Sequence, residues 1–525
     1  MPYAVQKQRT KSTTIPAPVG GVNALNSLYG MEPTDAVYQY NIIPKEFGLT
    51  VRKGTREHVI NLDNPVLTVM TYRDITTGAE TLFAATIDGI FDVTVRTDAP
   101  SAPVLPWPNN TGEAGYCSFT QWVDVSNTGY LLVADAVNGY YIYDGTTWTL
   151  AIMTGAGPDA IDIDFVMVWK SRVWFLAKNS ATGWFLAPGQ IEGSLLDGNL
   201  EFGNKFRYGD GVVGLYNWTL EDGSGLDNLL VVLGRAGDVL VYKATDPTTV
   251  DLNLVGHWYV GPFPAGNRLT TDYGGDLMIL STYGIISLQG LMAGVALERQ
   301  QQWVSAKISP YVREVMRDTI NFLGWEVRVD PDEGVMIVMS PQRGSKARIQ
   351  FVMYTATQSW CMYRGLKMDC GVYSRDNFYY GEDNSVIEMT GTLDNVSFDN
   401  QIREPIPWAL LTSYQDYGSP GHWKRAQFLR PLFISQYAPD YTVSARYDFN
   451  IEDIGQQPIS LPRDGSLWDE ALWDSGIWGG GFSVVQQPSG ASGMGRHVAI
   501  QVIGRSSFRT TFVGVDVMLD AGGML

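Results

Sequence analysis

The sequence contains 525 residues, of which 45% are hydrophobic and 12% aromatic, so the chain can bury a large core and is not intrinsically disordered. The 37 Lys and Arg residues stand against 55 Asp and Glu, and this net charge of −18 argues against a protein that grips nucleic acid by neutralising phosphates. Three cysteines, no apolar signal core at the N-terminus and no long apolar stretch predict a protein that folds in a reducing cytoplasm and does not span a membrane.

Residues 1–57 differ in character from the rest of the chain. They begin as a polar arm with three basic residues, Lys7, Arg9 and Lys11, and continue as an irregular segment rich in turn residues. Such an arm is either a frayed terminus or a segment that becomes ordered on a neighbouring subunit. We therefore regard the three basic residues as candidates for a partner interface.

Residues 58–400 contain a recurring hairpin pattern. Each repeat has an apolar strand, a Gly, Asp or Asn turn and an aromatic-rich second strand, in segments 80–95, 129–150, 168–189, 228–247, 275–290, 334–365 and 370–391. Most of the repeats follow one another at about 35 to 50 residues, the length of a propeller blade. The pattern predicts a mainly β protein with a degenerate β-propeller of about seven blades. A sandwich or an irregular β-prism is the alternative.

A helical insertion is expected near residues 297–322. Ser309 and Pro310 suit the N-cap and first position of a helix, and apolar residues recur at helical spacing over residues 310–320. The helix either packs on the blades or contacts another subunit.

The sequence of residues 401–525 predicts a C-terminal β platform domain. We expect the N-terminal segment to be part of the same domain. Within it, the loop at residues 464–481 contains Trp468, Trp473 and Trp478, each five residues after the last. Neither a helix nor a strand would place this spacing on one face. The loop either anchors to its own domain or inserts into a neighbouring subunit, as tryptophan often does at interfaces.

The sequence contains few motifs of common catalytic and metal sites, and the one pattern match lacks the expected context. The four histidines, His58, His257, His422 and His497, are scattered and form no metal-binding motif. Residues 209–214 match G-x-G-x-x-G, but the residues after them predict a strand and not the helix that a dinucleotide needs. The acidic residues Asp159, Asp162 and Asp164 are interpreted as a solvated loop edge. We therefore expect that the protein is not an enzyme and that it binds no cofactor and no metal ion.

Several short motifs, in order along nearly the whole chain, point to one family. They are Ala17-Pro18, Gly20-Gly21 and Asn23; Met31, Pro33, Asp35-Ala36, Asn41 and Pro44; Val51-Arg52-Lys53-Gly54; Gly418-Ser419-Pro420, Lys424-Arg425 and Arg430-Pro431; the Trp-Asp loop; and Ala521-Gly522-Gly523-Met524-Leu525. This set resembles the tail nozzle (tail tubular) proteins of short-tailed, podovirus-like bacteriophages. Gln39 and Tyr40 depart from the family pattern, which has an aliphatic and an acidic residue there.

The resemblance implies a β-propeller on a platform domain, assembled as a homohexameric ring in the virion tail. Such a ring lies below the adaptor, or head–tail connector, encloses the channel for DNA ejection and contacts tail fibres or spikes. It implies no catalytic residue, no cofactor, and viral DNA that passes without specific binding. The expected location is the virion tail after synthesis in the host cytoplasm. The alternative is a propeller that binds a host-surface glycan or receptor, or, less in keeping with the sequence, a glycosidase.

Overall fold

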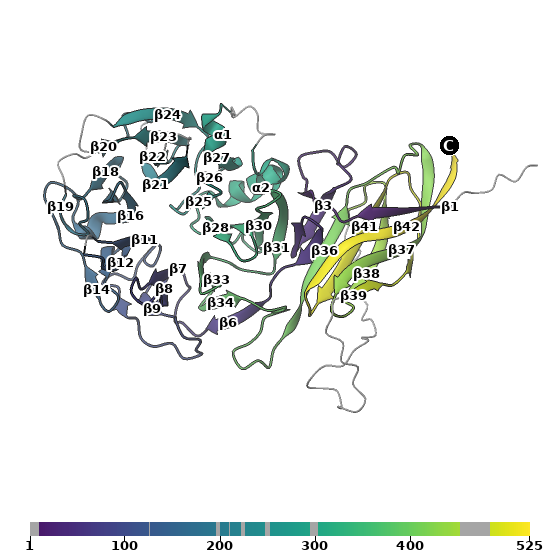
Figure 1. Ribbon diagram of the computed structural model, residues 1–525, viewed down its shortest axis with the longest axis horizontal. Coiled ribbons are helices and arrows are strands. Elements are labelled where there is room, and N and C mark those ends of the chain that lie inside the picture. Colours follow the sequence, from purple (N-terminus) through teal and green to yellow (C-terminus); the bar gives the residue numbers. More distant parts are fainter. Residues whose placement is uncertain are drawn as a thin grey trace, which may run out of the picture. The chain divides into compact units, whose positions relative to one another are not determined.

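A computed structural model of the chain describes residues 10–124, 126–195, 200–208, 211–221, 226–246, 252–294, 303–451 and 483–524. The protein is mainly β and divides into two compact units (Figure 1). Unit 1 comprises Met1–Arg56, Phe351–Arg364 and Thr390–Leu525, and unit 2 comprises Glu57–Gln350 and Gly365–Met389. The chain crosses between the units within β6 (Thr55–Val59) and β30 (Ile349–Tyr354), and again near residues 364 and 389.

The strands of unit 2 form a series of small antiparallel sheets in chain order. The first two are β7 (Thr68–Arg73), β8 (Glu80–Thr86), β9 (Gly89–Asp92) and β10 (Leu105–Pro106), then β11 (Cys117–Val123), β12 (Gly129–Asp135), β13 (Gly139–Tyr143) and β14 (Trp148–Leu150). The next two are β16 (Ile163–Trp169), β17 (Arg172–Ala177), β18 (Thr182–Phe185) and β20 (Leu200–Glu201), then β21 (Val212–Glu221), β22 (Leu226–Gly234), β23 (Asp238–Lys243) and β24 (Asn253–Tyr259).

Three further sets of strands complete the series. They are β25 (Thr270–Tyr273), β26 (Asp276–Ser281) and β27 (Gly284–Ser287); β28 (Glu326–Asp330) and β29 (Val335–Met339), which β30 follows in the same sheet; and β32 (Cys370–Ser374), β33 (Asn377–Glu382) and β34 (Ser385–Met389), with β6 beside β34. A two-stranded parallel pair, β15 (Met153–Thr154) with β19 (Gly193–Ser194), lies outside them. The first strand of each set lies toward the inside of the series (Figure 1).

Successive sheets of unit 2 share hydrophobic clusters, and the last sheet packs on the first. The ring centroids of Phe83 in the first sheet and Tyr143 in the second are 5.1 Å apart. Those of Tyr140 in the second sheet and Phe175 in the third are 4.8 Å apart. One cluster contains residues of β7, β8 and β9 together with residues of β32, β33 and β34. Residues 229–233 of the middle strand β22 are therefore covered on both faces, which explains their uninterrupted apolar sequence.

The hairpin turns use glycine where the backbone requires it. Gly139 follows Asn138 at the β12–β13 turn and has a φ of +88°. A Cβ at this position would lie 2.2 Å from the carbonyl oxygen of Ala160, so any side chain would collide with the neighbouring backbone.

Helices are few and short in the described part of the chain. They are α1 (Leu288–Met292), α2 (Ser309–Thr319) and the 3₁₀ turns η1 (Ala160–Asp162) and η3 (Ala306–Ile308). The helix expected over residues 310–320 is present as α2, with Pro310 in its first turn. Val312, Val315 and Met316 are buried, so the apolar stripe of α2 packs inward.

Two β-sheets pack face to face in unit 1. The first contains β39 (Ser483–Gln486), β37 (His422–Ser435), β42 (Thr510–Met524), β5 (Gly48–Val51) and β4 (Ile42–Lys45), with β1 (Thr10–Pro16) beside β42 and β40 (Ser489–Gly490) beside β37. The second contains β31 (Ser359–Arg364), β3 (Asp35–Tyr40), β36 (Glu404–Thr412), β41 (Val498–Ser506) and β38 (Asp440–Tyr447), with β2 (Gly21–Val22) beside β3 and β35 (Leu393–Asp394) beside β36.

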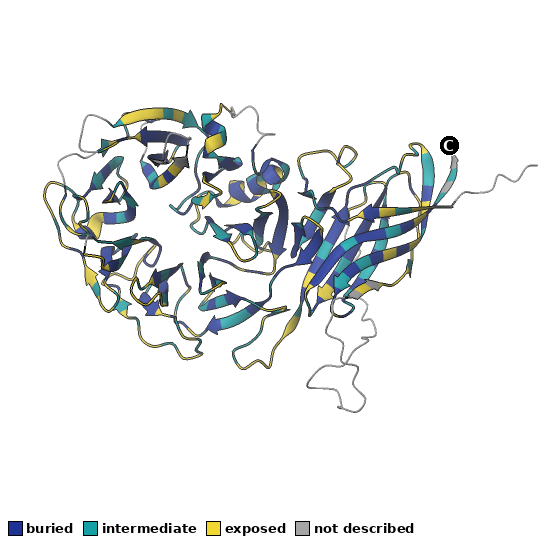
Figure 2. Cartoon of the chain, in the orientation of Figure 1, coloured by how far each residue is buried: buried dark blue, intermediate teal, exposed yellow. Residues whose placement is uncertain are grey.

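The core of unit 1 lies between these sheets. One hydrophobic cluster combines Phe433 and Phe512 of the first sheet with Leu410 and Val502 of the second. Buried and more exposed residues alternate along β37, as a strand with one face on a core requires (Figure 2). Strands from both ends of the chain thus build one sandwich, to which residues 351–364 add β31, although the sequence analysis assigned that segment to the hairpin series.

Candidate functional site

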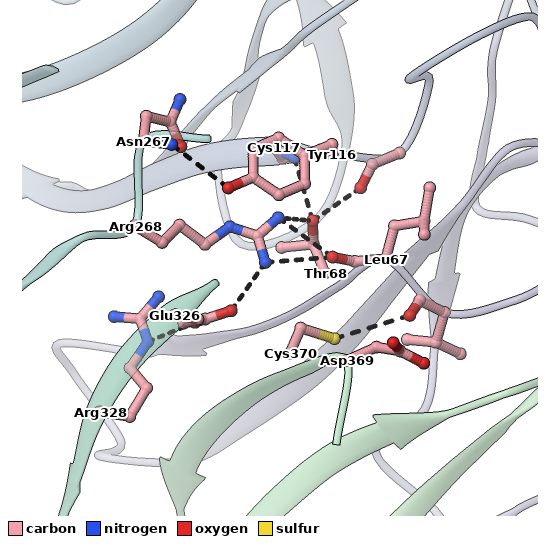
Figure 3. Close-up of polar contacts among 12 residues, drawn as sticks. Leu67, Thr68, Tyr116, Cys117, Asn267, Arg268, Glu326, Arg328, Asp369 and Cys370 are labelled. Carbon is pink, nitrogen blue, oxygen red and sulfur yellow. Dashed lines mark hydrogen bonds and ion pairs between the residues drawn. The ribbon is translucent and has the colours of Figure 1, made fainter. Parts of the chain in front are cut away.

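A buried arginine is the centre of a polar network in unit 2 (Figure 3). The guanidinium of Arg268 donates from both terminal nitrogens to the carbonyl oxygen of Leu67, at 3.1 and 3.0 Å, and from one of them to Oγ1 of Thr68 at 2.7 Å. It also donates to Oε2 of Glu326 at 2.8 Å, and these ion-paired side chains are 5% and 2% exposed. The ring of Tyr116 lies beneath the guanidinium, 4.0 Å from its carbon to the ring centroid.

The network continues into neighbouring strands. Oγ1 of Thr68 donates to the carbonyl oxygen of Gly115 at 2.6 Å and accepts from the backbone N–H of Cys117 at 3.0 Å. Oε1 of Glu326 accepts from Nε of Arg328 at 2.5 Å. The network therefore joins the first strands β7, β11 and β28 to the residues just before β25, which are far apart in the sequence.

Burial determines the protonation states around this network. Although burial disfavours its charge, Glu326 and other neighbouring groups keep the pKa of Arg268 above its ordinary value. Burial and then the charge of Asp135 raise the pKa of the Cys117 thiol well above the usual value, and burial with Glu326 raises that of Cys370 to about 12. Both thiols are therefore protonated at neutral pH and are poor nucleophiles. The arrangement holds strands together and does not activate a nucleophile.

Two cavities lie at different positions along the first strands of the unit 2 sheets. The cavity that we call the strand cavity has a volume of 560 Å³ and is lined by residues within β11, β16 and β21, with Arg328. The second, which we call the rim cavity, has a volume of 700 Å³ and lies where these strands begin. Its lining includes Tyr116, Asp164 and Val212. Both cavities touch Asn267, whose backbone N–H donates to the Tyr116 hydroxyl at 3.3 Å. Tyr116, Asn267 and Arg268 thus form a partition at the centre of the unit.

In unit 1, the residues that carry the family resemblance form a buried polar set. Arg52 pairs with both carboxylate oxygens of Asp394, at 2.7 and 2.6 Å, and its Nε donates to Oδ1 of Asn41 at 3.1 Å. The Asn41 amide donates in turn to the carbonyl oxygens of Arg364 and Pro407, at 3.0 and 2.8 Å. Bidentate Arg–carboxylate geometry of this kind fixes orientation as well as adding attraction.

The remaining matched residues of the N-terminal segment serve close packing. Nδ2 of Asn23 donates to Oδ2 of the buried Asp35 at 2.6 Å. A Cβ on Gly21 would lie 2.6 Å from the backbone nitrogen of Trp360, and one on Gly54 would lie 2.0 Å from the carbonyl oxygen of Leu393. These residues hold the segment in unit 1 and do not form an exposed site.

Most of the interface candidates predicted from the sequence cannot be placed. Lys7, Arg9, Trp468, Trp473 and Trp478 lie outside the described residues, as does part of the G-x-G-x-x-G match. Lys11 belongs to β1, where its backbone is paired with Leu519 of β42.

Two further features concern the described part of the chain as a whole. It contains no group of three or more His, Cys, Asp or Glu residues placed to hold a metal ion. It also has no helix that is both long and apolar enough to cross a membrane.

Sequence reasoning missed the central residues of unit 2. Arg268 is a single arginine before a short strand, and its partners lie 58 to 201 positions away. Asp164 was grouped with Asp159 and Asp162, which are exposed, whereas Asp164 is partly buried and lines the rim cavity. The interrupted alternation at the start of β16 is the one local sign that could have separated it from its neighbours.

Comparison with known proteins identifies no family for this chain. No protein-family model matches the sequence, and no curated protein does. Among solved structures, it is similar to the WD40 β-propeller domain of Doa1, with 9% identity, coverage of 64% of this chain and 96% of the other, and a TM-score of 0.35. It is also similar to Raptor of Chaetomium thermophilum, with 12% identity, coverage of 68% and 30%, and a TM-score of 0.37. A third similar structure is BBS1N in complex with ARL6DN, with 14% identity, coverage of 46% and 73%, and a TM-score of 0.29. Because all three TM-scores lie below 0.5, we base the assignments that follow on this chain's own sheets and contacts.

Proposed function

We propose that this chain is a structural protein of a short-tailed bacteriophage virion, the subunit of the tail nozzle ring. The observation that carries the proposal is the buried set of Asn23, Asp35, Asn41, Arg52 and Gly54 in unit 1. These are residues of the N-terminal motifs that resemble the nozzle family. Each has a specific packing or hydrogen-bonding role, so the motif match involves residues on which the unit 1 structure depends.

Within this proposal, unit 2 is a β-propeller of about seven blades, and unit 1 is the platform. The sheets of unit 2 follow chain order, with their first strands inside, and the last packs on the first through a shared hydrophobic cluster. This chain order and the shared cluster support the proposal of a propeller. The ends of the chain, residues 1–57 and 401–525, supply most of the strands of unit 1.

The filled centre of unit 2 bears on how DNA would pass. Arg268, Tyr116 and Glu326 contact one another across the space between the first strands β7, β11 and β28, so we infer that a duplex does not pass through one copy of unit 2. A DNA channel would therefore lie between several copies, as it does in a sixfold ring. The net charge of −18 suits a channel wall that lets DNA phosphates slide.

The proposed partners are further copies of the chain, the tail adaptor, a tail fibre or spike protein, and viral DNA without specific binding. The chain would act without catalysis or cofactor in the virion tail. Immunogold electron microscopy with an antibody against the chain tests the location. Gold at the tips of short tails is the expected result, whereas particles without label and free antigen would overturn the proposal.

A second experiment tests the predicted interface loop. Deletion of residues 464–481, or replacement of Trp468, Trp473 and Trp478 by Ala, should prevent six chains of 58.0 kDa from assembling into one ring. The matched control replaces the same tryptophans by Phe, which keeps large aromatic side chains, and should retain more assembly. Ring formation is measured by mass photometry and electron microscopy, with circular dichroism as the check on folding. If the chain without residues 464–481 formed normal rings, the loop would not be part of the interface between subunits.

A further inference from the structure

The rim cavity of unit 2 has features of a binding site that the proposed structural role does not use. Its volume of 700 Å³ lies in the range of cavities that hold small-molecule ligands. It opens where the first strands begin, whereas the strand cavity lies along their later residues. All of its lining residues belong to unit 2.

Two β-bulges shape the rim cavity. In β16 the pairing moves from Ile163 with Ala177 to Phe165 with Leu176, so Asp164 is the extra residue. In β21 an equivalent shift makes Val213 the extra residue. Bulges at strand ends redirect side chains and often occur beside functional sites. Both extra residues line this one cavity.

Charged groups of both signs meet at the rim cavity. Nζ of Lys178 donates to the carbonyl oxygens of Val137 and Ile161, at 3.0 and 2.9 Å, which fixes the ammonium and leaves its third proton available to a ligand. Arg235 lines the cavity with an exposed side chain, as does Glu113. A ligand carboxylate would find two cations there, one of them held in position by the backbone.

Asp164 is sensitive to this environment. Burial raises the pKa of its carboxyl to about 6, although the charges of Lys178 and Arg235 lower it and that of Glu113 raises it. An anion bound nearby would disfavour the charged carboxylate further. Binding of such a ligand would therefore be accompanied by proton uptake near neutral pH, and protonated Asp164 could donate a hydrogen bond.

Apolar residues form one part of the lining, among them Leu176, Val212, Val213, Pro262, Phe263 and Leu323. We propose that the rim cavity binds a carboxylate-bearing sugar unit of an acidic polysaccharide. Its carboxylate lies between Lys178 and Arg235, and its hydroxyl groups bond to Asp164 and Glu113. Its C–H face lies on the apolar wall. Each chemical feature of a uronic acid thus has a counterpart in this lining, and the inference does not depend on the proposed role in a tail.

The first test measures the binding of oligogalacturonate to the full-length chain by isothermal titration calorimetry. The methyl-esterified oligosaccharide, which has the same ring without the charge, is the matched control ligand. We expect at least tenfold weaker binding of the ester. Equal affinity for both forms, no binding of the acid, or equally tight binding of acetate or of a peptide carboxylate would overturn the proposal.

Variants then locate the site. Arg235→Gln should weaken oligogalacturonate binding about tenfold and, because the side chain is exposed, should leave the fold intact. Lys178→Met should do the same, with its folding checked by circular dichroism because the ammonium also bonds to the backbone. The matched control, Arg317→Gln, removes an exposed charge on α2 outside the lining and should leave affinity unchanged. Unchanged affinity in Arg235→Gln and Lys178→Met would overturn the proposal.

The pH dependence provides a readout specific to Asp164. Affinity for oligogalacturonate should rise several-fold from pH 7.5 to pH 5.5, because the bound state takes up a proton. Asp164→Asn should remove most of this rise and bind at pH 7.5 about as tightly as the native chain does at low pH. A fall in affinity over this range, or an unchanged pH profile in Asp164→Asn, would contradict the assigned geometry.

Discussion

Replacement of Arg268 by Met tests whether the polar network stabilises the centre of unit 2. The substitution removes four hydrogen bonds and leaves the Glu326 carboxylate, 2% exposed, with only one of its two arginine partners, Arg328. Breaking a buried ion pair by removal of one partner costs about 3–5 kcal/mol. Arg328 still donates to Glu326, so we expect the lower part of this range.

The expected result is a fall of roughly 5–10 °C in the unfolding temperature of unit 2, measured by calorimetry. The matched control, Arg317→Gln, changes the charge by the same amount at a side chain that is 76% exposed, and should shift stability by less than about 0.5 kcal/mol. A loss in Arg268→Met no larger than in this control would show that the network contributes nothing.

A double-mutant cycle separates the ion pair from the rest of the network. Glu326→Gln keeps an acceptor for Arg328 and removes the buried negative charge. Combined with Arg268→Met, it should lose less stability than the sum of the two single changes, by about 1–3 kcal/mol. Additive losses would mean that Arg268 acts through Leu67 and Thr68 and not through the carboxylate.

Three further changes test other parts of the structure. Gly54→Ala places a Cβ 2.0 Å from a backbone carbonyl oxygen, so amides of unit 1 should exchange hydrogen markedly faster, whereas Gly490→Ala, with nothing within 4 Å, should change little. Asp394→Ala leaves Arg52 buried without its bidentate partner and should cost about 3–5 kcal/mol in a denaturant titration of unit 1. Asp164→Asn should stabilise unit 2 by up to about 3 kcal/mol at pH 7–8, because burial raises the pKa of Asp164 from 3.8 to about 6 and penalises the carboxylate. Since that penalty declines as pH falls through 6 and vanishes below 3.8, calorimetry at pH 4 should find almost no difference.

Local patterns predicted the β elements well where the cause is local. The segment at residues 129–150 became β12, β13 and β14, and its Asn138-Gly139 turn has the positive φ that glycine tolerates. The helix at residues 310–320 followed from its apolar stripe and from Pro310 in the first turn, which are local signals. Ser309 was expected as the N-cap, but it is the first helical residue, and Ile308 occupies the N-cap position without a side-chain capping bond. Such features depend on neighbours in the chain and can be read without tertiary contacts.

Features that depend on distant partners could not be read in the same way. β31 belongs to the unit 1 sandwich because Tyr40 of β3 pairs with Met362, and no pattern within residues 351–364 indicates this. The role of Arg268 likewise depends on partners in other sheets. The bulge that turns Asp164 toward the rim cavity is set by its register against β17. Residue composition alone therefore placed Asp164 on a solvated loop.

The partition formed by Tyr116, Asn267 and Arg268 in unit 2 constrains the proposed ring assembly more than the net charge of the chain does. The charge of −18 is a property of the whole chain and would suit many surfaces. Arg268, in contrast, connects the first strands through bonds to Leu67, Thr68 and Glu326 that would all have to break for the centre to open. Opening would break this ion pair together with three further hydrogen bonds of Arg268, so the network favours the closed centre. If the chain forms a nozzle, its gate must then consist of contacts between copies or of loops outside this network, and variants that seal or widen the channel should map there.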